Sequence, residues 1–429
     1  MNWQLARRSG DDAGGGGCAG VLYHRLVSTH TSPSNTGEET HIQALDGIRG
    51  LAILLVLACH SADVYTPHGR AHSTLTELLY RMMGAGWLGV DLFFVLSGFL
   101  ITGILLKSKR NKSYFRHFYM RRFLRISPLY YLYVTAAVLL VFLRPAYRIV
   151  GPEVVAALTY TQNFYLAYTG HIALLLAHFW SLAVEEHFYL VWPMLIFVMS
   201  RKGVVRACAT GIACSLTLRL VLLHWATMYR VVFYITPCRL DGLLVGAWLA
   251  VIYSKPEEWR RIQPYAVPVG AAAAALIAAI AIRQRHLFDY VRPNYMDVYH
   301  HSSYLILGPG LTVMAVLWGA CLVYGISAGW ARSWLSVRPL RLIGKYSYGM
   351  YVLHLEALNL MSNTPLLRDI KPLPPVVALV TAFVVLTAMC LAAAALSYHL
   401  FEVHFLRLKR YFAEPAVVDI YPARRPDQA

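Results

Sequence analysis

Residues 45–65 read LDGIRGLAILLVLACHSADVY and decide the fold class. A helix needs about 20 mostly apolar residues to cross a bilayer, and this stretch supplies them. Comparable apolar segments recur along the chain, and each predicts a further spanning helix. The predicted spans begin near Leu45, Trp87, Ile126, His187, Val204, Pro237, Tyr265, Tyr304, Tyr346 and Pro374. The sequence therefore predicts an all-α, polytopic membrane helix bundle with about ten transmembrane helices.

The overall composition supports a membrane protein and excludes most other classes. Of 429 residues, 58% are hydrophobic and 14% are charged, whereas an average soluble domain carries roughly 25% charged residues. A soluble enzyme this apolar could not cover its core with polar surface, and disordered and fibrous chains are excluded as well. The 7 cysteines include no CxxC pair, so the sequence indicates neither a disulfide framework nor a metal site.

Positive charge is gathered in short segments between the apolar stretches. The chain has 39 Lys and Arg against 22 Asp and Glu, a net charge of +17. Nucleic-acid binding could explain such an excess, but short basic loops are typical of the positive-inside rule, and we predict no nucleic-acid partner. The basic segments are residues 107–125, 201–206, 255–261, 332–345 and 407–410. All five share one side of the membrane if residues 154–177 do not span it, which predicts two cytoplasmic termini.

The chain divides into three predicted parts. Residues 1–40 contain many glycines and serines and few large apolar residues, which is typical of a disordered cytoplasmic tail. No apolar segment of signal-peptide type precedes residue 40, so we expect the first span to remain in the mature protein. Residues 41–410 form the transmembrane domain, and residues 411–429 form a flexible C-terminal tail. The predicted location is the cell membrane, with several crossings.

Ionisable residues within apolar spans are candidates for function because each costs roughly 2.5–3.5 kcal/mol to insert. The first span carries Asp46, Arg49 and His60. Arg49 and His60 are eleven residues apart, which places them on one helix face about 16 Å apart along the axis. Arg49 could instead anchor the helix at the membrane interface, and His60 could bond to a neighbouring helix. Their shared face favours a functional pair.

Two further groups of charged residues lie at predicted span ends. Arg122 and Arg125 are three residues apart at the mouth of the third span. They could clamp a phosphate with two guanidinium groups, or serve only as a topology anchor. Glu185 and Glu186 lie at a predicted helix start, where the helix dipole favours acids. A polar active-site vestibule would use the same two carboxylates.

Polar residues also occur in the sixth and ninth spans. Tyr348, Tyr351 and His354 recur every three residues and so share one helix face. Tyrosines are common at membrane interfaces, whereas a histidine within a span is harder to explain by packing. Arg239 and Asp241 open the sixth span, and we expect them to pair with each other or across the bundle.

Seven segments in this order resemble the acyltransferase-3 family of bacterial integral-membrane acyltransferases, from about Gln43 to Leu406. The segments are LDGIRGLAILLVLACH, GVDLFFVLSGFLI, RRFLRISPLYYLY, FWSLAVEEHFYLVWP, YITPCRLDGLLVGA, IGKYSYGMYVLHL and SYHLFEVHFLRL. One segment alone would be weak, but seven in order are specific. The family pattern of an arginine, ten residues and a histidine matches Arg49 and His60. Its second pattern, two arginines separated by two residues, matches residues 122–125.

The resemblance implies transfer of an acyl group, usually acetyl, from cytoplasmic acyl-CoA to a hydroxyl. The implied acceptors are a cell-surface glycan, a lipid-linked sugar or a similar molecule, and residues 41–410 would be the acyltransferase domain, surrounded by membrane lipids. His187 replaces a common glutamine, and Glu402 is not followed by the usual proline; we expect both to affect packing or acceptor choice. Some members carry a fused SGNH-type domain that this chain lacks, so it would act alone or with a separate extracytoplasmic transferase.

Acyl transfer needs a base for the acceptor proton and donors for the developing oxyanion. From the residues and the resemblance together, we predict His60 as the base, Arg49 near the thioester and Glu186 as a further catalytic residue. The predicted substrate-binding residues are Asp46, Arg122, Arg125, Glu185, Tyr348 and His354. Ser97 and Cys59 are candidate nucleophiles should a covalent intermediate form. We predict no bound cofactor, since acyl-CoA is a substrate.

Two other classes of function remain open. A transporter of an acyl or glycolipid group would also use buried charges and histidines, although the sequence shows no inverted repeat. A structural or receptor protein would have no need for Arg49 and His60 on one membrane-embedded face. An assay with labelled acyl-CoA separates an enzyme from both alternatives.

Overall fold

Helices account for all regular elements in the part of the chain that the computed structural model describes, so the all-α prediction is confirmed there. The described residues are 42–64, 73–143, 149–226, 228–284, 304–370 and 372–412. They belong to one unit of the fold, Ile42–Glu414. The predicted tails lie outside the described residues, except for residues 411 and 412.

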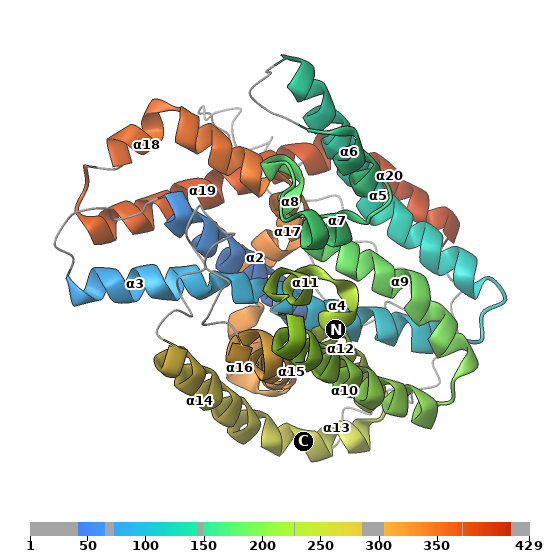
Figure 1. Cartoon of the computed structure of the whole chain (residues 1–429). Helices are drawn as coiled ribbons and strands as arrows, with labels where there is room; N and C mark the ends of the chain where they lie inside the picture. The colour runs from blue at the N-terminus through green and yellow to red at the C-terminus, as the bar shows by residue number, and fades with distance from the viewer. Residues whose placement is uncertain are drawn as a thin grey trace, which may run out of the picture. The chain divides into compact units, whose positions relative to one another are not determined.

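Each of the ten predicted spans corresponds to one long helix (Figure 1). These helices are α2 (Gln43–Val64), α4 (Gly89–Ser108), α5 (Tyr114–Leu143), α9 (Trp180–Val198), α10 (Arg201–Ala226), α12 (Leu240–Tyr253), α14 (Ala266–Gln284), α15 (Leu311–Ser327), α17 (Arg338–Asn363) and α19 (Pro375–Ser397). Shorter helices connect them: α3 (Thr74–Gly84), α6 (Gly151–Leu158), α7 (Gln162–Thr169), α8 (Leu174–Ala177), α11 (Tyr229–Tyr234), α13 (Pro256–Ile262), α16 (Gly329–Leu335), α18 (Pro365–Ile370) and α20 (Val403–Arg407).

Length and apolarity qualify eight helical segments of the described chain as membrane spans, which confirms a polytopic membrane bundle. Two of the ten predicted spans fall outside this set. Helix α12 is apolar but has only 14 residues, and α17 has 26 residues but is too polar. Residues 154–177 form parts of α6, α7 and α8, which have at most 8 residues each and are therefore too short to cross a bilayer alone.

Three predicted span starts are wrong because the helices begin before the predicted apolar segments; one of them is α17, which begins at Arg338 and not near Tyr346. Helix α5 begins at Tyr114, so Arg122 and Arg125 lie about two to three turns inside it, not at its mouth. Helix α9 begins at Trp180, and no acid lies in its first turn. The helix dipole therefore does not explain Glu185 and Glu186. Hydropathy marks where a segment becomes apolar, whereas a helix can begin earlier among charged residues.

Side-chain contacts bring three of the basic segments together. The Lys109 ammonium donates to the carbonyl oxygen of Met199 at 2.5 Å, which joins segment 107–125 to the start of α10. The Arg201 guanidinium donates to the carbonyl oxygen of Val251 at 3.0 Å and also binds the Glu258 carboxylate. Segment 201–206 therefore lies against segment 255–261.

The other two basic segments join the same end of the bundle. The Arg116 guanidinium of α5 lies 5.6 Å from the ring centre of Phe412, which follows segment 407–410. Trp259 and Leu335 share one buried cluster with Ala44 at the start of α2, so segment 332–345 lies there too. We call this region the basic end. All five basic segments meet there, as a shared membrane side requires.

Helix α2 lies near the middle of the bundle, between α4, α17 and α19 (Figure 1). Helices α2 and α17 run side by side in the same direction, because Gly344 near the start of α17 meets Asp46 near the start of α2. A Cβ atom on Gly344 would lie 1.8 Å from the carbonyl oxygen of Asp46, so only glycine allows this approach. This packing places Tyr348, Tyr351 and His354 beside the functional face of α2.

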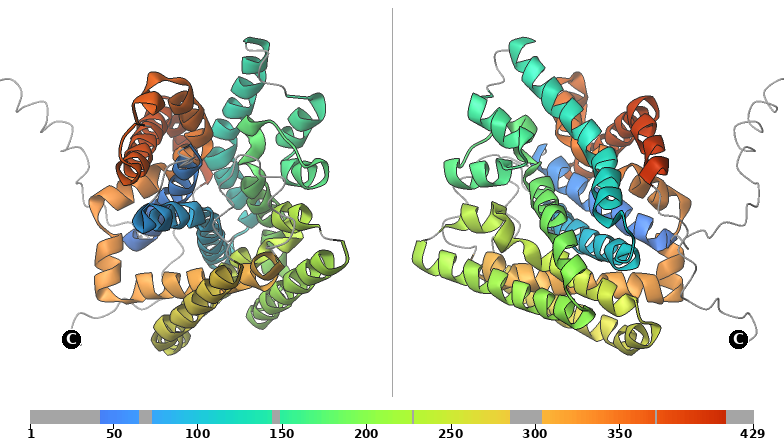
Figure 2. Two further views of the ribbon diagram at one scale, coloured as in Figure 1. Left: turned by 60° about the vertical axis from the view of Figure 1, so that its left-hand side comes forward. Right: turned by 90° about the vertical axis from the view of Figure 1, so that its right-hand side faces the viewer.

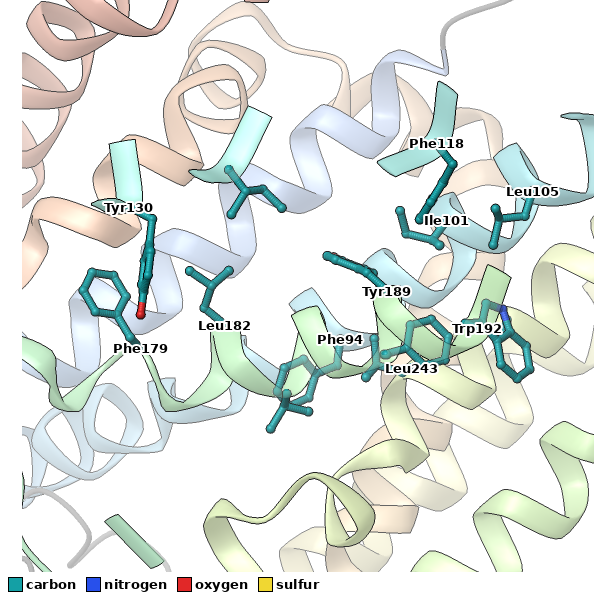
Figure 3. Packing of buried hydrophobic residues seen from close by; sticks show 14 of the residues in the cluster. Phe94, Ile101, Leu105, Phe118, Tyr130, Phe179, Leu182, Tyr189, Trp192 and Leu243 are labelled. Carbon is teal, nitrogen blue, oxygen red and sulfur yellow. The ribbon is translucent and has the colours of Figure 1, made fainter. Parts of the chain in front are cut away.

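Aromatic and aliphatic side chains fill the space along α9. Figure 3 labels Leu182, Tyr189 and Trp192 of α9, together with Phe179 just before α9 and Phe94 of α4. Helices α10 and α14 instead lie at the margin of the bundle in both views of Figure 2. Only 22% of the apolar window of each is buried, which leaves broad apolar faces for lipid.

The contact between α4 and α12 depends on glycine and gives a stability prediction. A Cβ atom on Gly98 would lie 1.9 Å from the carbonyl oxygen of Leu243, whereas one on Gly103 would meet nothing within 4 Å. We expect Gly98→Ala to lower the free energy of unfolding by at least about 1–3 kcal/mol, because backbone must move. Gly103→Ala on the same helix is the matched control. Thermal unfolding in detergent measures both, and equal melting temperatures would contradict the tight α4–α12 contact.

Candidate active site

A pocket of about 810 Å³, including its open mouth, lies between α2, α4, α5, α9 and α17. The polar side chains that line it are Arg49, Ser97, Arg122, Arg125, Ser181, Glu185, Tyr189, Ser347, Tyr348 and Tyr351. We call it the arginine pocket, because three guanidinium groups from two helices converge on it.

The three arginines of the pocket carry more positive charge than their bonded partners neutralise. Arg49 donates to the Asp46 carboxylate at 2.7 Å. The Arg122 guanidinium lies over the ring of Tyr189, 5.0 Å from its centre. Among the described residues, neither Arg122 nor Arg125 forms an ion pair with a carboxylate within 4.0 Å. Arg49 repels both of them, and the carboxylates of Glu185 and Glu402 offset part of this charge.

Glu185 faces the pocket and has two hydrogen-bond donors. Ser97 and Tyr189 donate to its two carboxylate oxygens, each at 2.8 Å. Ser97, a candidate nucleophile, therefore lines the pocket with its hydroxyl donated to the Glu185 carboxylate. Cys59, the other candidate nucleophile, is buried and donates to the carbonyl oxygen of Gly84 at 3.3 Å; it does not line the pocket.

Glu186, unlike its neighbour in sequence, does not line the arginine pocket. Its Oε1 atom is buried without a hydrogen-bond partner in the described part of the chain. Its electrostatic neighbours nevertheless include Arg122 and Tyr348, which do line the pocket. The structure thus places the two acids of the motif in different surroundings, and only Glu185 reaches the pocket directly.

Two tyrosines of α17 form one wall of the pocket. The Tyr348 hydroxyl donates to the carbonyl oxygen of Ile126 at 2.5 Å, and this bond ties α17 to α5. The Tyr351 hydroxyl lies 2.6 Å from that of Ser181 and donates to the carbonyl oxygen of His178. Tyr351 therefore lies between the pocket and His178.

Three histidines form a cluster beyond Tyr351, which we call the histidine cluster. The rings of His60 and His354 have centres 5.0 Å apart, and those of His178 and His354 are also 5.0 Å apart. His354 is 0% exposed and, like His60, is not among the residues that line the pocket. No group of three metal-binding side chains suited to an ion occurs within the described ranges.

Ser181, Tyr189 and His178 were not singled out by the sequence analysis. Tyr189 and Ser181 lie in the segment that carries Glu185, four residues to either side of it. One helical turn separates such positions, so the 3.6-residue period places them on the face of Glu185. His178 gives no comparable signal, because its contact with His354 of α17 joins distant parts of the chain.

Arg239 and Asp241 pair across the bundle rather than with each other. Arg239 donates to Asp91 at 2.9 Å, and Asp241 accepts two bonds from the buried Arg219 guanidinium at 2.7 and 2.8 Å. Full burial of charge is tolerated because each ion is paired. These pairs join α10 and α12 to each other and to α4, and they do not line the arginine pocket.

The two departures from the family pattern lie outside the arginine pocket. The His187 ring contacts the Thr236 hydroxyl at 2.6 Å and stacks on Phe164. Glu402 accepts a hydrogen bond from Ser397 at 3.1 Å and lines a second, smaller pocket. Effects of either residue on packing or acceptor choice stay predictions.

Comparison with known proteins identifies the family. A family model described as an acyltransferase domain matches residues 42–398. The chain belongs to this acyltransferase-3 family. It is 30% identical over 352 residues to the peptidoglycan O-acetyltransferase OatA of Listeria monocytogenes, covering 77% of this chain and 51% of the relative. It is 30% identical over 383 residues to the putative peptidoglycan O-acetyltransferase YrhL of Bacillus subtilis, covering 86% and 55%.

A third relative is the O-acetyltransferase OatA of Staphylococcus aureus, which is 27% identical over 333 residues, covering 73% of this chain and 50% of that protein. The acyltransferase-3 chain described here thus spans about half the length of these curated relatives. No solved structure matches it.

Proposed function

We propose that this protein is a membrane-embedded O-acyltransferase that moves an acetyl group from acyl-CoA to a hydroxyl of a cell-surface glycan. Membership of the acyltransferase-3 family supports the reaction class. The names of the relatives support acetyl as the group and a glycan such as peptidoglycan as the acceptor. The observation that carries the proposal is the convergence of Arg49, Arg122 and Arg125 on one pocket.

The charge of the arginine pocket suits the phosphates of coenzyme A. Guanidinium groups bind phosphate oxygens through paired hydrogen bonds. The second, smaller pocket shares Arg125 and Tyr348 with the arginine pocket and adds Lys345 and Glu402. A long donor could therefore lie across both, with its phosphates near Arg125. Arg49, at the basic end of α2, then contacts the donor on the phosphate side of the thioester.

The proposed chemistry is direct acyl transfer. The acceptor hydroxyl oxygen attacks the thioester carbonyl carbon, a C–O bond forms, and the C–S bond breaks to release the coenzyme A thiolate. His60 takes the hydroxyl proton and later returns it to the thiolate. Arg49 lies about 16 Å from His60 along α2, too far to reach the same carbonyl group, so we assign it to donor binding and not to the oxyanion. We also propose Glu186 as a further catalytic residue, although it does not line the pocket.

The proposed orientation places the basic end in the cytoplasm of the cell, at the inner face of the cell membrane. Acyl-CoA is a cytoplasmic donor, and the positive-inside rule assigns basic segments to the same face. Both termini would then be cytoplasmic. A separate extracytoplasmic transferase, lipid-linked sugars and membrane lipids are the further proposed partners on the acceptor side.

The alternative function is transport of an acyl or glycolipid group without chemistry. Purified protein given radiolabelled acetyl-CoA and a glycan acceptor distinguishes the two. An enzyme yields acceptor with a covalently bound label together with an equal amount of free coenzyme A. Intact acetyl-CoA or an unmodified acceptor after complete translocation would favour the transporter.

A further inference from the structure

We propose that His354 is a positioning residue that fixes the tautomer of His60 in the histidine cluster. The inference rests on the proposed function, in which His60 is the base. It gives His354 a role through another side chain, in place of the direct substrate contact that the sequence predicted. Its basis is the hydrogen bonding and burial of His354 and His178.

The hydrogen bonds of His354 define which of its ring nitrogens carries the proton. Its Nδ1 atom lies 2.6 Å from the carbonyl oxygen of Tyr351. A carbonyl oxygen only accepts, so Nδ1 donates and the neutral ring keeps its lone pair on Nε2. Nε2 is buried and has no hydrogen-bond partner among the described residues. An unpaired acceptor in the protein interior is costly and therefore calls for a donor.

His60 is positioned to supply that donor. The centres of the His60 and His354 rings are 5.0 Å apart, with a tilt of 39°. Two imidazoles joined by an N–H···N hydrogen bond have ring centres about 5 Å apart, given the usual donor–acceptor distance. When His60 turns one ring N–H toward Nε2 of His354, its other ring nitrogen is left unprotonated. That nitrogen is the one that can accept a proton from an acceptor hydroxyl.

His178 keeps His354 in place and neutral. Nε2 of His178 lies 3.2 Å from the carbonyl oxygen of Val352, so this nitrogen carries the proton and Nδ1 keeps a lone pair. The ring meets that of His354 edge to face, at 5.0 Å and 85°. Protonation of His354 would place a charge between two imidazoles in a dry interior, which is unfavourable. His354 therefore acts as an acceptor only.

The position of His354 argues against direct contact with a substrate. The side chain is 0% exposed, and its ring lies 5.5 Å from that of Tyr351, which lines the arginine pocket. A substrate in the pocket meets Tyr351 first. An arrangement in which one residue orients the catalytic histidine is the logic of the third member of a catalytic triad.

The test compares His354→Leu with His354→Gln. Leucine removes the acceptor, and we expect kcat for acetyl transfer to fall about 10- to 100-fold with an unchanged KM for acetyl-CoA. Glutamine can place an amide oxygen near the position of Nε2, so we expect it to restore most of kcat. His224→Leu, which removes an exposed histidine on the outer helix α10, is the control. Equal losses for Leu and Gln would overturn the positioning role.

A double-mutant cycle separates this inference from the proposed function. If His354 acts through His60, His354→Leu costs almost nothing further in a His60→Gln background. A full second loss in that background would show that His354 acts independently, and the inference would fail while His60 remains the base. Near-native turnover of His60→Gln alone would instead refute the proposed base. If His354→Leu does not fold, His354→Asn takes its place in the test. The asparagine amide can occupy the position of Nδ1 but provides no acceptor at the position of Nε2.

Discussion

His60→Gln is expected to reduce acetyl transfer about 10²- to 10⁴-fold, the range that a general base contributes. Glutamine keeps the approximate size and hydrogen bonding of histidine but cannot accept a full proton. His60 lies beside His354 and is not among the residues that line the arginine pocket, so its replacement should leave donor binding unchanged. The measurement is kcat with labelled acetyl-CoA, together with binding of acyl-CoA and elution as a single species in detergent.

The control for His60 is His224→Gln on the outer helix α10, where the side chain is exposed. We expect it to retain full turnover. Near-native turnover of His60→Gln would show that His60 only packs or orients other groups. The base would then have to be Glu185, Glu186 or His354, and Glu185 would be tested first because it lines the pocket.

Replacing Arg122 and Arg125 together by alanine is expected to weaken acyl-CoA binding about 100-fold or more. Each hydrogen bond to a charged group contributes about 1.5–3 kcal/mol, and 1.4 kcal/mol is a factor of ten in affinity. Binding measured by isothermal titration in detergent tests the loss. Arg116→Ala is the matched control, since Arg116 lies on the same helix but stacks on Phe412 outside the pocket.

A donor analogue without nucleotide phosphates makes the arginine test specific. The double variant should bind this analogue almost as well as the unchanged protein does. If both donors lose the same affinity, Arg122 and Arg125 stabilise the fold or the topology and do not hold the phosphates. The assignment of the arginine pocket as the donor site would then be wrong.

Apolar periodicity predicted the helices well because the bilayer imposes one length scale on every span. All ten predicted segments became helices, including α12 and α17, whose lengths and polarity differ from a standard span. The same reasoning misplaced the starts of α5, α9 and α17, because a helix can begin before the charged residues that precede its apolar segment. For this reason Arg122 and Arg125 were expected at a helix mouth although they lie within α5.

Helical spacing predicted which residues share a helix, but not which of them line one pocket. Tyr348 and Tyr351 share α17 and both line the arginine pocket, whereas on α2 Arg49 lines it and His60 does not. The meeting of His60 with His354, and of His354 with His178, depends on packing between α2, α17 and the segment before α9. No spacing within the sequence encodes such contacts. Likewise, the bonds that Ser97 and Tyr189 donate to Glu185 became visible only in three dimensions.

The central claim is that acyl-CoA reaches the arginine pocket from the basic end of the bundle. Supplying acyl-CoA to only one face of a reconstituted membrane tests this claim most directly. Single cysteines at Lys112, in the basic segment 107–125, and at Tyr290, outside the described residues, report the orientation through labelling with an impermeant reagent. The account predicts acetyl transfer only when acetyl-CoA is supplied to the face on which residue 112 is labelled. Transfer that requires acetyl-CoA on the face of residue 290 would contradict it, because the donor would then meet the end opposite the arginine pocket.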